Sequence, residues 1–288
     1  MAITEAAIRS VTAKLYEASL RRIPEDTRQA LLRAERAETA ELGRKTLTVM
    51  LQSAAAAEGG GQFLCSDAGV PVYLVRIGTR ARLEGRIRQA ISDGFADLVR
   101  NIQPPILKFV TNPLTNERSY QGRGMPIVTW DVVDDADYVE IVCSPKALGT
   151  GRWESVETFV SPDLATIEQY VLDSVIRAGS QPCLPIVVGV GIGGTMDYAA
   201  KMAKEALLRP VGSENPDPML ADMERRLLAA VNATGFGPMG TGGDSTAMAV
   251  FVDYCAGHGY TPVAVCINCW INRRTSARIY DTGEVVWE

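Results

Sequence analysis

The sequence is poor in histidine and has no concentration of basic residues. His258 is the single histidine among 288 residues, so a zinc site built from histidines or a serine–histidine relay is difficult to assemble. The formal net charge is −5, and no block of lysine and arginine offers the positive surface that nucleic-acid binding needs. Catalysis in this chain would therefore depend on thiols, carboxylates or a bound cofactor.

Long apolar runs are also missing. No stretch approaches the ~20 residues that a membrane-spanning helix needs, and residues 1–7 lack the charged-then-apolar layout of a signal peptide. We therefore expect a cytoplasmic protein that does not bind membranes. The composition, 47% hydrophobic and 22% charged, is typical of a globular protein, and the length suffices for one large domain or two small ones.

Cysteines are few, and they fall into two groups. The six are Cys65, Cys143, Cys183, Cys255, Cys266 and Cys269. A disulfide framework is not expected in a reducing compartment, and Cys143, Cys255 and Cys266 are expected to be buried structural residues. Cys65, Cys183 and Cys269 form the second group, because each lies on a glycine-rich loop. Three such thiols can hold three irons of a cubane cluster and leave the fourth iron open as a Lewis acid. The spacing of the three cysteines is compatible with such a cluster but does not by itself demonstrate one.

The strongest local pattern spans residues 182–208, where an apolar strand, four glycines and a helix follow one another. Such glycines allow a ligand or another backbone to come close, and the amides at a helix start favour anions. Gly189, Gly191 and Gly194 also fit G-x-G-x-x-G. A dinucleotide site further requires an acidic residue about 20 positions on, at the end of a second strand. Helix and a turn-rich loop follow here instead, which disfavours that interpretation.

Periodicity along the rest of the chain predicts a single α/β body over residues 1–288. Helices are expected at residues 3–57 with an interruption at Pro24, and at 80–100, 162–178 with Ser161 or Asp163 as cap, and 219–233. Strands are expected at 72–77, 127–133, 138–143 and 261–269. Residues 235–243 contain five glycines, and a helix with Ser and Thr in its first turn is expected to follow them.

Three segments allow either a functional or a structural interpretation. Cys65 and Asp67 lie on a glycine-flanked turn before a strand, where the thiol is either a metal ligand or nucleophile or a buried structural group. The charged, glycine-containing segment 146–154 is either an anion-binding loop or a solvated turn. Cys266 and Cys269 form a C-x-x-C, but the helix start that a redox pair requires and the second C-x-x-C that a zinc site requires are both missing.

Several motifs together resemble the iron–sulfur (class I) fumarate hydratase and L-tartrate dehydratase α-subunit family. They are residues 183–185 (Cys-Leu-Pro), 189–195 (Gly-Val-Gly-Ile-Gly-Gly-Thr), 215–218 (Asn-Pro-Asp-Pro), 237–240 (Gly-Pro-Met-Gly), 242–243 (Gly-Gly), 262–265 (Pro-Val-Ala-Val), 269–270 (Cys-Trp) and 273–274 (Arg-Arg). Residues 65–69, Cys-Ser-Asp-Ala-Gly, are similar to the family's Cys-Gln-Asp-Thr-Gly. The motifs stand in the family order and cover nearly the whole chain.

The resemblance implies a mixed-sheet α/β fold with surrounding helices and a helical N-terminal segment over residues 1–57. It also implies a 4Fe–4S cluster on Cys65, Cys183 and Cys269, and reversible addition or removal of water at a hydroxy-(di)carboxylic acid. Asp67 matches the family aspartate and would transfer a proton or contact the substrate hydroxyl. In the family most substrate-binding arginines lie in a β part, so a β-type partner chain is implied, in a heterotetramer of two α and two β chains or in a homodimer.

The chain departs from the family pattern at positions that face the substrate. Ser66 replaces a glutamine, Ile106 an arginine and Asp244 a lysine, and residues 146–154 differ from the family's Gly-Gly-Ser-Glu-Asn loop. His258 lies one position from the family histidine. A dicarboxylate needs cationic or amide partners at both ends. The residues predicted to contact the substrate are Ser66, Lys108, Arg123, Lys146 and Arg152.

Two functions are compatible with these observations. The first is the α subunit of a hydro-lyase whose substrate differs from fumarate. The second is a subunit that binds the cluster without turnover, or serves in assembly, because the substrate-facing positions have changed.

Overall fold

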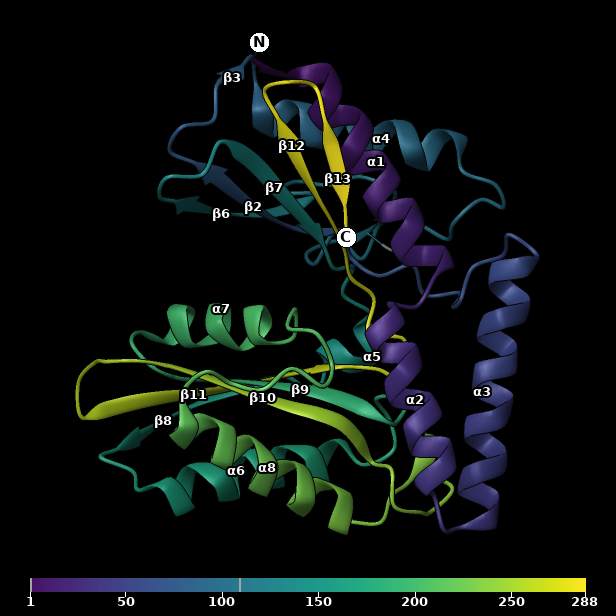
Figure 1. The fold of residues 1–288 in the computed structure, drawn as a ribbon, viewed down its shortest axis with the longest axis vertical. Coiled ribbons are helices and arrows are strands. Elements are labelled where there is room, and N and C mark those ends of the chain that lie inside the picture. The colour runs from purple at the N-terminus through teal and green to yellow at the C-terminus, as the bar shows by residue number, and fades with distance from the viewer. Residues whose placement is uncertain (1, 109) are drawn as a thin grey trace. The chain divides into compact units, whose positions relative to one another are not determined.

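The chain, described by a computed structural model for residues 2–108 and 110–288, forms two compact units (Figure 1). The first unit comprises Met1–Ile23, Ala56–Leu148 and Arg273–Glu288, and the second comprises Pro24–Ala55 and Gly149–Asn272. Both units combine helices with mixed sheets, which confirms the expected α/β class. The expectation of one functional domain over residues 1–288 stays a prediction.

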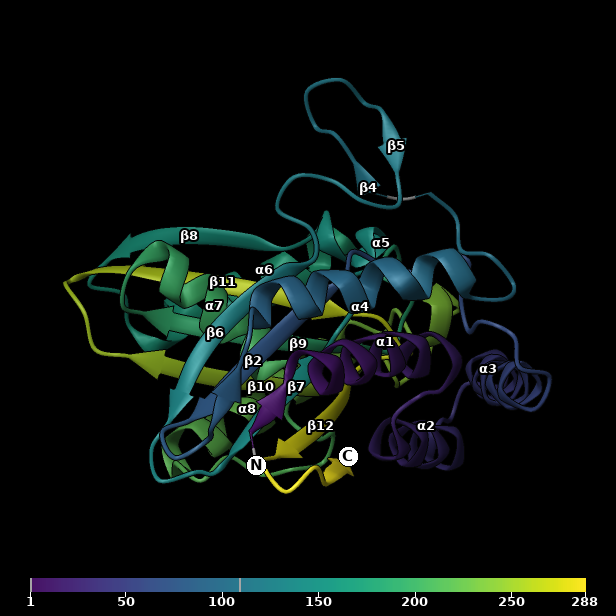
Figure 2. The same cartoon turned by 90° about the horizontal axis from the view of Figure 1, so that it is seen from above.

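The first unit is built on a five-stranded mixed sheet with the strand order β13-β12-β7-β2-β6. The strands are β2 (Val72–Gly78), β6 (Ile127–Val133), β7 (Tyr138–Cys143), β12 (Thr275–Tyr280) and β13 (Val285–Trp287). Helices α1 (Glu5–Arg21) and α4 (Ile87–Asn101) lie side by side on the sheet (Figures 1 and 2). Gly94 permits this close approach, because a Cβ there would overlap the carbonyl of Arg9.

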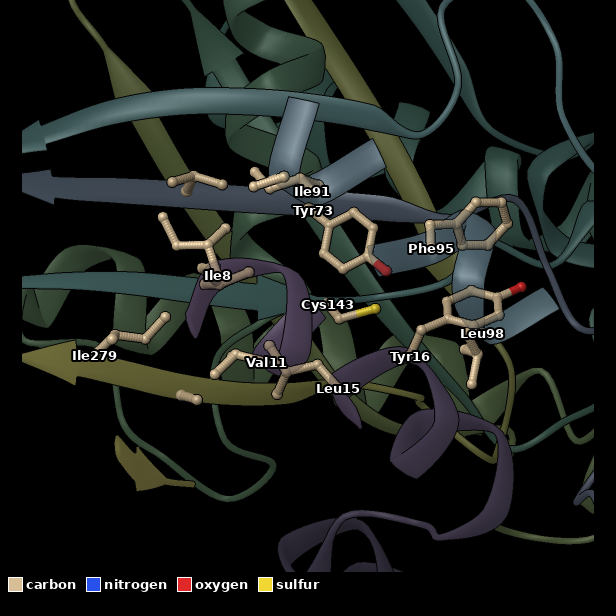
Figure 3. Close-up of a cluster of buried hydrophobic side chains, with 14 of the residues drawn as sticks. Ile8, Val11, Leu15, Tyr16, Tyr73, Ile91, Phe95, Leu98, Cys143 and Ile279 are labelled. Atoms are coloured by element: carbon tan, nitrogen blue, oxygen red, sulfur yellow. The ribbon is translucent and has the colours of Figure 1, made fainter. Parts of the chain in front are cut away.

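Apolar residues at helical spacing build the core of the first unit (Figure 3). Ile8, Val11 and Leu15 of α1 share one face of the helix and pack with residues of α4 and of the sheet. Cys143 is fully buried in this core, and burial raises the pKa of its thiol, so the group stays protonated at neutral pH. The expectation that Cys143 is structural is confirmed.

Short elements complete the first unit. A two-residue parallel pair joins β1 (Ile3–Thr4) to β3 (Leu83–Glu84). The expected helix 80–100 therefore begins later, at Ile87, because the residues before it pair with the N-terminus. The long polar loop 104–126 contains a small hairpin of β4 (Val110–Thr111) and β5 (Arg118–Ser119), which Figure 2 shows extending away from α4.

The second unit is a three-layer sandwich. Its four-stranded sheet has the order β10-β9-β11-β8, with β9 (Ile186–Gly193), β10 (Ala247–Cys255), β11 (Tyr260–Asn268) and β8 (Ser155–Val160). Helix α7 (Met196–Ala206) covers one face, and α6 (Leu164–Ala178) and α8 (Pro218–Ala233) cover the other (Figure 1). Asp163 caps α6 by accepting the amide of Thr166 at 2.8 Å, as one of the two expected caps.

The N-terminal segment is helical as expected, in three helices. They are α1, α2 (Glu25–Ala37) and α3 (Glu41–Gly59), with breaks at Pro24 and again near residue 39. The short helices α5 (Leu148–Gly151) and η1 (Pro238–Gly240) complete the list of described elements. Within residues 2–108 and 110–288, none of the helices combines the length and apolar character that crossing a bilayer requires.

The expectation of a helix after the glycine-rich segment 235–243 is wrong. Residues from Ala247 form β10, which pairs in parallel with β9. Ala249 and Phe251 pack in the core under α7, while Val250 and Val252 pack in the core under α8. An apolar run that is buried on both faces carries no strand alternation, so periodicity could not distinguish it from a buried helix.

The glycines of β9 serve helix packing. A Cβ at Gly189 would overlap the carbonyl of Ala203, and one at Gly191 would overlap that of Ala199, both in α7. The G-x-G-x-x-G pattern is therefore explained by the contact between a strand and the helix that follows it.

A buried carboxylate ties α8 to the sheet. Glu224 accepts hydrogen bonds from the Arg209 guanidinium (2.5 and 3.3 Å), the Asn215 side chain (2.9 Å) and the Val252 amide (2.8 Å). Asp217 caps α8 by accepting the Met219 amide at 2.8 Å. The motif at residues 215–218 is thus the start of α8 and its anchor to β10.

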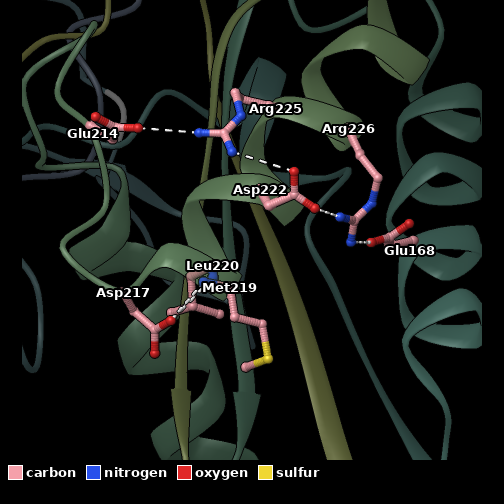
Figure 4. Close-up of polar contacts among 8 residues, drawn as sticks. All are labelled: Glu168, Glu214, Asp217, Met219, Leu220, Asp222, Arg225 and Arg226. Atoms are coloured by element: carbon pink, nitrogen blue, oxygen red, sulfur yellow. Dashed lines mark hydrogen bonds and ion pairs between the residues drawn. The ribbon is translucent and has the colours of Figure 1, made fainter.

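Replacing Glu224 should therefore destabilise the second unit. Glu224→Ala leaves Arg209 and several donors without their acceptor, and we expect a loss of about 3 kcal/mol. Asp222→Ala is the matched control, because Asp222 bridges Arg225 and Arg226 on the solvent face of the same helix (Figure 4) and should cost less than about 0.5 kcal/mol. Urea unfolding of both variants gives the measurement, and equal midpoints would contradict the anchoring role.

Candidate functional site

Two predicted cluster ligands come together within the second unit. β9 and β11 are antiparallel neighbours with Val187 opposite Asn268, so the residues before β9 and after β11 emerge at the same end of the sheet. The Trp270 amide donates a hydrogen bond to the Cys183 carbonyl at 3.1 Å. Cys183 is exposed and Cys269 is partly exposed. The fold therefore places two accessible thiols on adjacent segments.

Unusual backbone conformations surround this pair. Six non-glycine residues among those described have a positive φ, and three of them lie here: Cys183 (58°), Met239 (52°) and Asn272 (45°). The Met239 amide donates to the Leu184 carbonyl at 3.1 Å, and the Asn272 amide donates to the Cys269 carbonyl at 2.9 Å. Left-handed conformations are costly for these residues and gather at functional sites, so this end of the sheet is the leading site candidate in the second unit.

The glycine-rich segment beside Cys183 binds a carboxylate of the protein itself. Glu38, only 2% exposed, accepts the amides of Asp244 (2.8 and 3.0 Å) and Ser245 (3.0 Å). The amides of Thr246 and Ala247 go to the side chain of Asn232. These four amides are consequently engaged inside the second unit and do not form an open cradle for a ligand.

Asp244, where the family resemblance predicts a lysine, ties the same segment to Thr39 between α2 and α3. Its carboxylate accepts the hydroxyl of Thr39 at 2.6 Å and the amide of Thr39 at 2.9 Å. These hydrogen bonds lower the pKa of Asp244, so the side chain is anionic at neutral pH. Asp244 therefore has a structural role, in which its carboxylate binds Thr39.

The third predicted ligand lies in the first unit, on an irregular loop with Ser66 and Asp67. Cys65 is partly exposed and Ser66 is exposed. The Asp67 carboxylate accepts the amides of Gly69 (2.9 Å) and Leu148 (3.2 Å), which fixes its orientation. A carboxylate has about four lone-pair positions, so Asp67 retains capacity for another partner.

Lys146 is the predicted cation that the structure brings to this loop. Its backbone forms a bridge with Val70, through hydrogen bonds of 2.8 and 2.9 Å. Gly69, with φ +77°, allows this approach because a Cβ there would crowd the carbonyl carbons of Pro145 and Lys146. The backbone of Lys146 is therefore next to the loop of residues 65–69, and the roles of Ser66, Asp67 and Lys146 toward a substrate stay predictions.

The other predicted substrate residues are exposed: Lys108 and Arg123 in the first unit and Arg152 in the second. Lys108 is exposed at the base of the β4–β5 hairpin, with its ammonium over the Tyr120 ring at 5.7 Å. Arg123 is exposed in the turn before β6. Arg152, in the second unit, stacks its guanidinium on Trp153 at 4.8 Å. Their roles toward a substrate stay predictions. Ile106, at the family arginine position, is buried in the core of the first unit.

The remaining cysteines are unsuited to the same site. Cys266 is buried in the core under α7, whereas Cys269 is partly exposed. This difference in exposure disfavours a C-x-x-C redox pair. Cys255 pairs with Gly193 at the far end of β9, about 23 Å along the strand from Ile186, whereas Cys183 lies just before Ile186. Within each unit, no group of three or more His, Cys, Asp or Glu among the described residues could hold a metal ion.

Sequence reasoning missed three residues that shape these loops. Glu38 binds the amides beside Cys183, and Tyr16 and Arg273 bind carbonyls of the loop that carries Cys65. The Arg-Arg motif at residues 273–274 could have pointed to Arg273. Tyr16 and Glu38 lie in the helical N-terminal segment, where the sequence gives no sign of a role beyond helix packing.

Comparison with known proteins identifies the family of the chain. The family model described as Fumarate hydratase (Fumerase) matches residues 9–278. A provisionally named L(+)-tartrate dehydratase subunit alpha of Methanocaldococcus jannaschii is 34% identical over 279 residues, which covers 94% of this chain and 97% of the relative. An Escherichia coli L(+)-tartrate dehydratase subunit alpha is 30% identical over 263 residues, which covers 90% of this chain and 86% of the relative. The chain belongs to the fumarate hydratase (Fumerase) family.

Proposed function

We propose that this chain is the α subunit of a hydro-lyase that adds water to, or removes it from, a hydroxy-(di)carboxylic acid with the help of a 4Fe–4S cluster. The observation that carries the proposal is the approach of Cys183 and Cys269 at one end of the second sheet, through the 3.1 Å hydrogen bond between Trp270 and Cys183. The family of the chain supports the reaction class. Its relatives are named as subunits alpha, which supports a β-type partner chain. A cytoplasmic location and the assembly type stay predictions.

The donor set suits such a cluster. Iron–sulfur clusters are held by cysteine thiolates, and Cys65, Cys183 and Cys269 are each at least partly exposed on irregular segments. Cys143 and Cys266 lie in cores, and Cys255 lies at the opposite end of β9. Three thiols would leave one iron without a protein ligand, as a hydro-lyase needs.

The chain's own residues would bind the substrate and move the proton. When bound, the cluster would supply a Lewis acid that polarises the carbon–oxygen bond of a substrate hydroxyl. Asp67, held by two backbone amides, would accept or return a proton at its remaining carboxylate positions. Ser66 would offer a hydroxyl, and Lys146 would offer a cation to a substrate carboxylate.

A cluster-binding subunit without turnover, or an assembly subunit, is the alternative. Burial of Ile106 favours it, because this position is part of the core and has no group that could bind a carboxylate. The complex of this chain with its β-type partner, assayed anaerobically, separates the two functions. An intact cluster with no turnover on any hydroxy-acid would support the alternative.

Removing a predicted ligand should remove the cluster. Cys65→Ser, Cys183→Ser and Cys269→Ser should each abolish or destabilise the brown absorption and lower the iron content of anaerobically purified protein. Cys143→Ser, Cys255→Ser and Cys266→Ser are the controls and should retain both, because these thiols lie in cores or at the far end of β9. Full iron loading of the Cys183→Ser variant would refute the ligand set.

Asp67→Asn should preserve the cluster and reduce kcat by about 100-fold or more, because an amide cannot exchange a proton at neutral pH. The asparagine oxygen can still accept the Gly69 amide, whereas its NH2 group would face the Leu148 amide. Iron content and circular dichroism therefore accompany the kinetics. A variant with intact cluster and wild-type turnover would remove Asp67 from the mechanism.

The complete complex should hydrate fumarate weakly or not at all and should turn over a related hydroxy-acid. The reason is that the family arginine is replaced by the buried Ile106, so the distal end of a dicarboxylate needs another partner. An anaerobic panel of malate, tartrate, citramalate and bulkier hydroxy-acids provides the measurement. Fast interconversion of malate and fumarate would show that this replacement does not set specificity.

A further inference from the structure

The loop that carries Cys65 and Asp67 is held by two side chains from distant parts of the first unit. Arg273 donates from Nη1 to the Asp67 carbonyl at 2.7 Å. The Tyr16 hydroxyl lies 2.8 Å from the Gly69 carbonyl and 3.2 Å from the Ala68 carbonyl. The single proton of the Tyr16 hydroxyl is donated mainly to Gly69 and shared with Ala68, so side chains of α1 and of the segment before β12 contact three consecutive carbonyls.

Such donors are needed because the loop is irregular and partly buried. Ala68 is 3% exposed, and a buried carbonyl that loses its donor costs about 1–3 kcal/mol. Both donors are themselves held firmly. Tyr16 is fully buried and packs edge-on against Phe95, with ring centroids 5.2 Å apart, and Arg273 is 4% exposed. Burial raises the pKa of Tyr16, which keeps its hydroxyl protonated as a donor.

The consequence falls on Asp67. Its carbonyl is bound by Arg273, and its carboxylate is bound by the amides of Gly69 and Leu148. The other end of the loop is fixed by the Leu64 amide, which donates to the Leu20 carbonyl at 3.0 Å. Main chain and side chain of Asp67 are therefore both restrained. If Arg273 or Tyr16 no longer donated to the carbonyls of the loop, the Asp67 carboxylate would lose its single orientation.

We infer that Arg273 and Tyr16 are positioning residues of the hydro-lyase, which orient Asp67 and Cys65 by binding the carbonyls of residues 67–69. The inference rests on the proposed function for its effect on catalysis, and on the hydrogen bonds above for its effect on the loop. Neither residue needs to touch the substrate. A shift of the reacting groups by about 1 Å can cost roughly 100-fold in rate, so the loss of either donor should be visible in kcat.

The test compares three variants with two matched controls in the complete complex. Arg273→Met and Tyr16→Phe each remove a donor, and Arg273→Lys keeps a cationic donor as the conservative replacement. Tyr73→Phe is the control for the tyrosine, because Tyr73 is equally buried and its hydroxyl binds the Thr12 carbonyl, away from the loop. Arg278→Met is the control for the arginine. Arg278 lies five residues after Arg273, and its guanidinium binds Glu140 instead of the loop.

Two readouts are taken on the same samples. Amide hydrogen exchange at Gly69 and Leu148 reports how stable the hydrogen bonds from these amides to the Asp67 carboxylate are. Steady-state kinetics on the substrate found in the panel give kcat and KM separately. We expect faster exchange and a 10- to 100-fold lower kcat with little change in KM for Arg273→Met and Tyr16→Phe. Arg273→Lys should recover most of both, and the two controls should match the wild type.

Unchanged exchange at Gly69 and Leu148 in Arg273→Met and Tyr16→Phe would overturn the inference, and so would faster exchange with an unchanged kcat. An equal effect of Tyr73→Phe would overturn it as well, because the cause would then be general loosening of the core. A wild-type complex with neither cluster nor turnover would instead refute the proposed function, and the exchange rates would still decide whether these residues hold the loop.

Discussion

The structure depends on one constraint: irregular backbone beside the predicted cluster cysteines must have its polar groups satisfied without help from helix or sheet. In the second unit Glu38 meets this need by accepting the amides of Asp244 and Ser245. In the first unit Tyr16 and Arg273 meet it by donating to the carbonyls of residues 67–69. In both cases a buried side chain far away in sequence determines the conformation of a loop.

The glycine-rich segments acquire a different meaning under this constraint. Glycines after a strand suggest a phosphate or dinucleotide, because exposed amides bind anions. Here Gly189 and Gly191 allow α7 to pack directly on β9, and the segment that ends in Gly243 wraps an internal carboxylate. Close approach of backbone to backbone, and of backbone to Glu38, accounts for the glycine pattern without a nucleotide.

The predicted cluster ligands and the predicted substrate residues lie on differently supported parts of the chain. The thiols of Cys183 and Cys269 lie on segments fixed by hydrogen bonds between β9 and β11, so they depend on sheet register. The predicted cations Lys108, Arg123 and Arg152, in contrast, are exposed on segments that can change without disturbing a core, whereas Lys146 is partly exposed and its backbone pairs with Val70. Ile106, where the family resemblance predicts an arginine, is by contrast part of the core of the first unit.

The sequence by itself determined the α/β class, the helices with a clear apolar stripe and the strands β2, β6, β7 and β11, because local periodicity reports which face is buried. It also singled out Cys65, Asp67, Cys183 and Cys269 through their motifs. Periodicity failed at β10, since both of its faces are buried. Only the tertiary structure decided that Cys183 and Cys269 are neighbours, that Cys255 is remote, and that Glu38, Tyr16 and Arg273 hold the loops. Those facts depend on strand pairing and on hydrogen bonds between residues up to 207 positions apart, which no local pattern encodes.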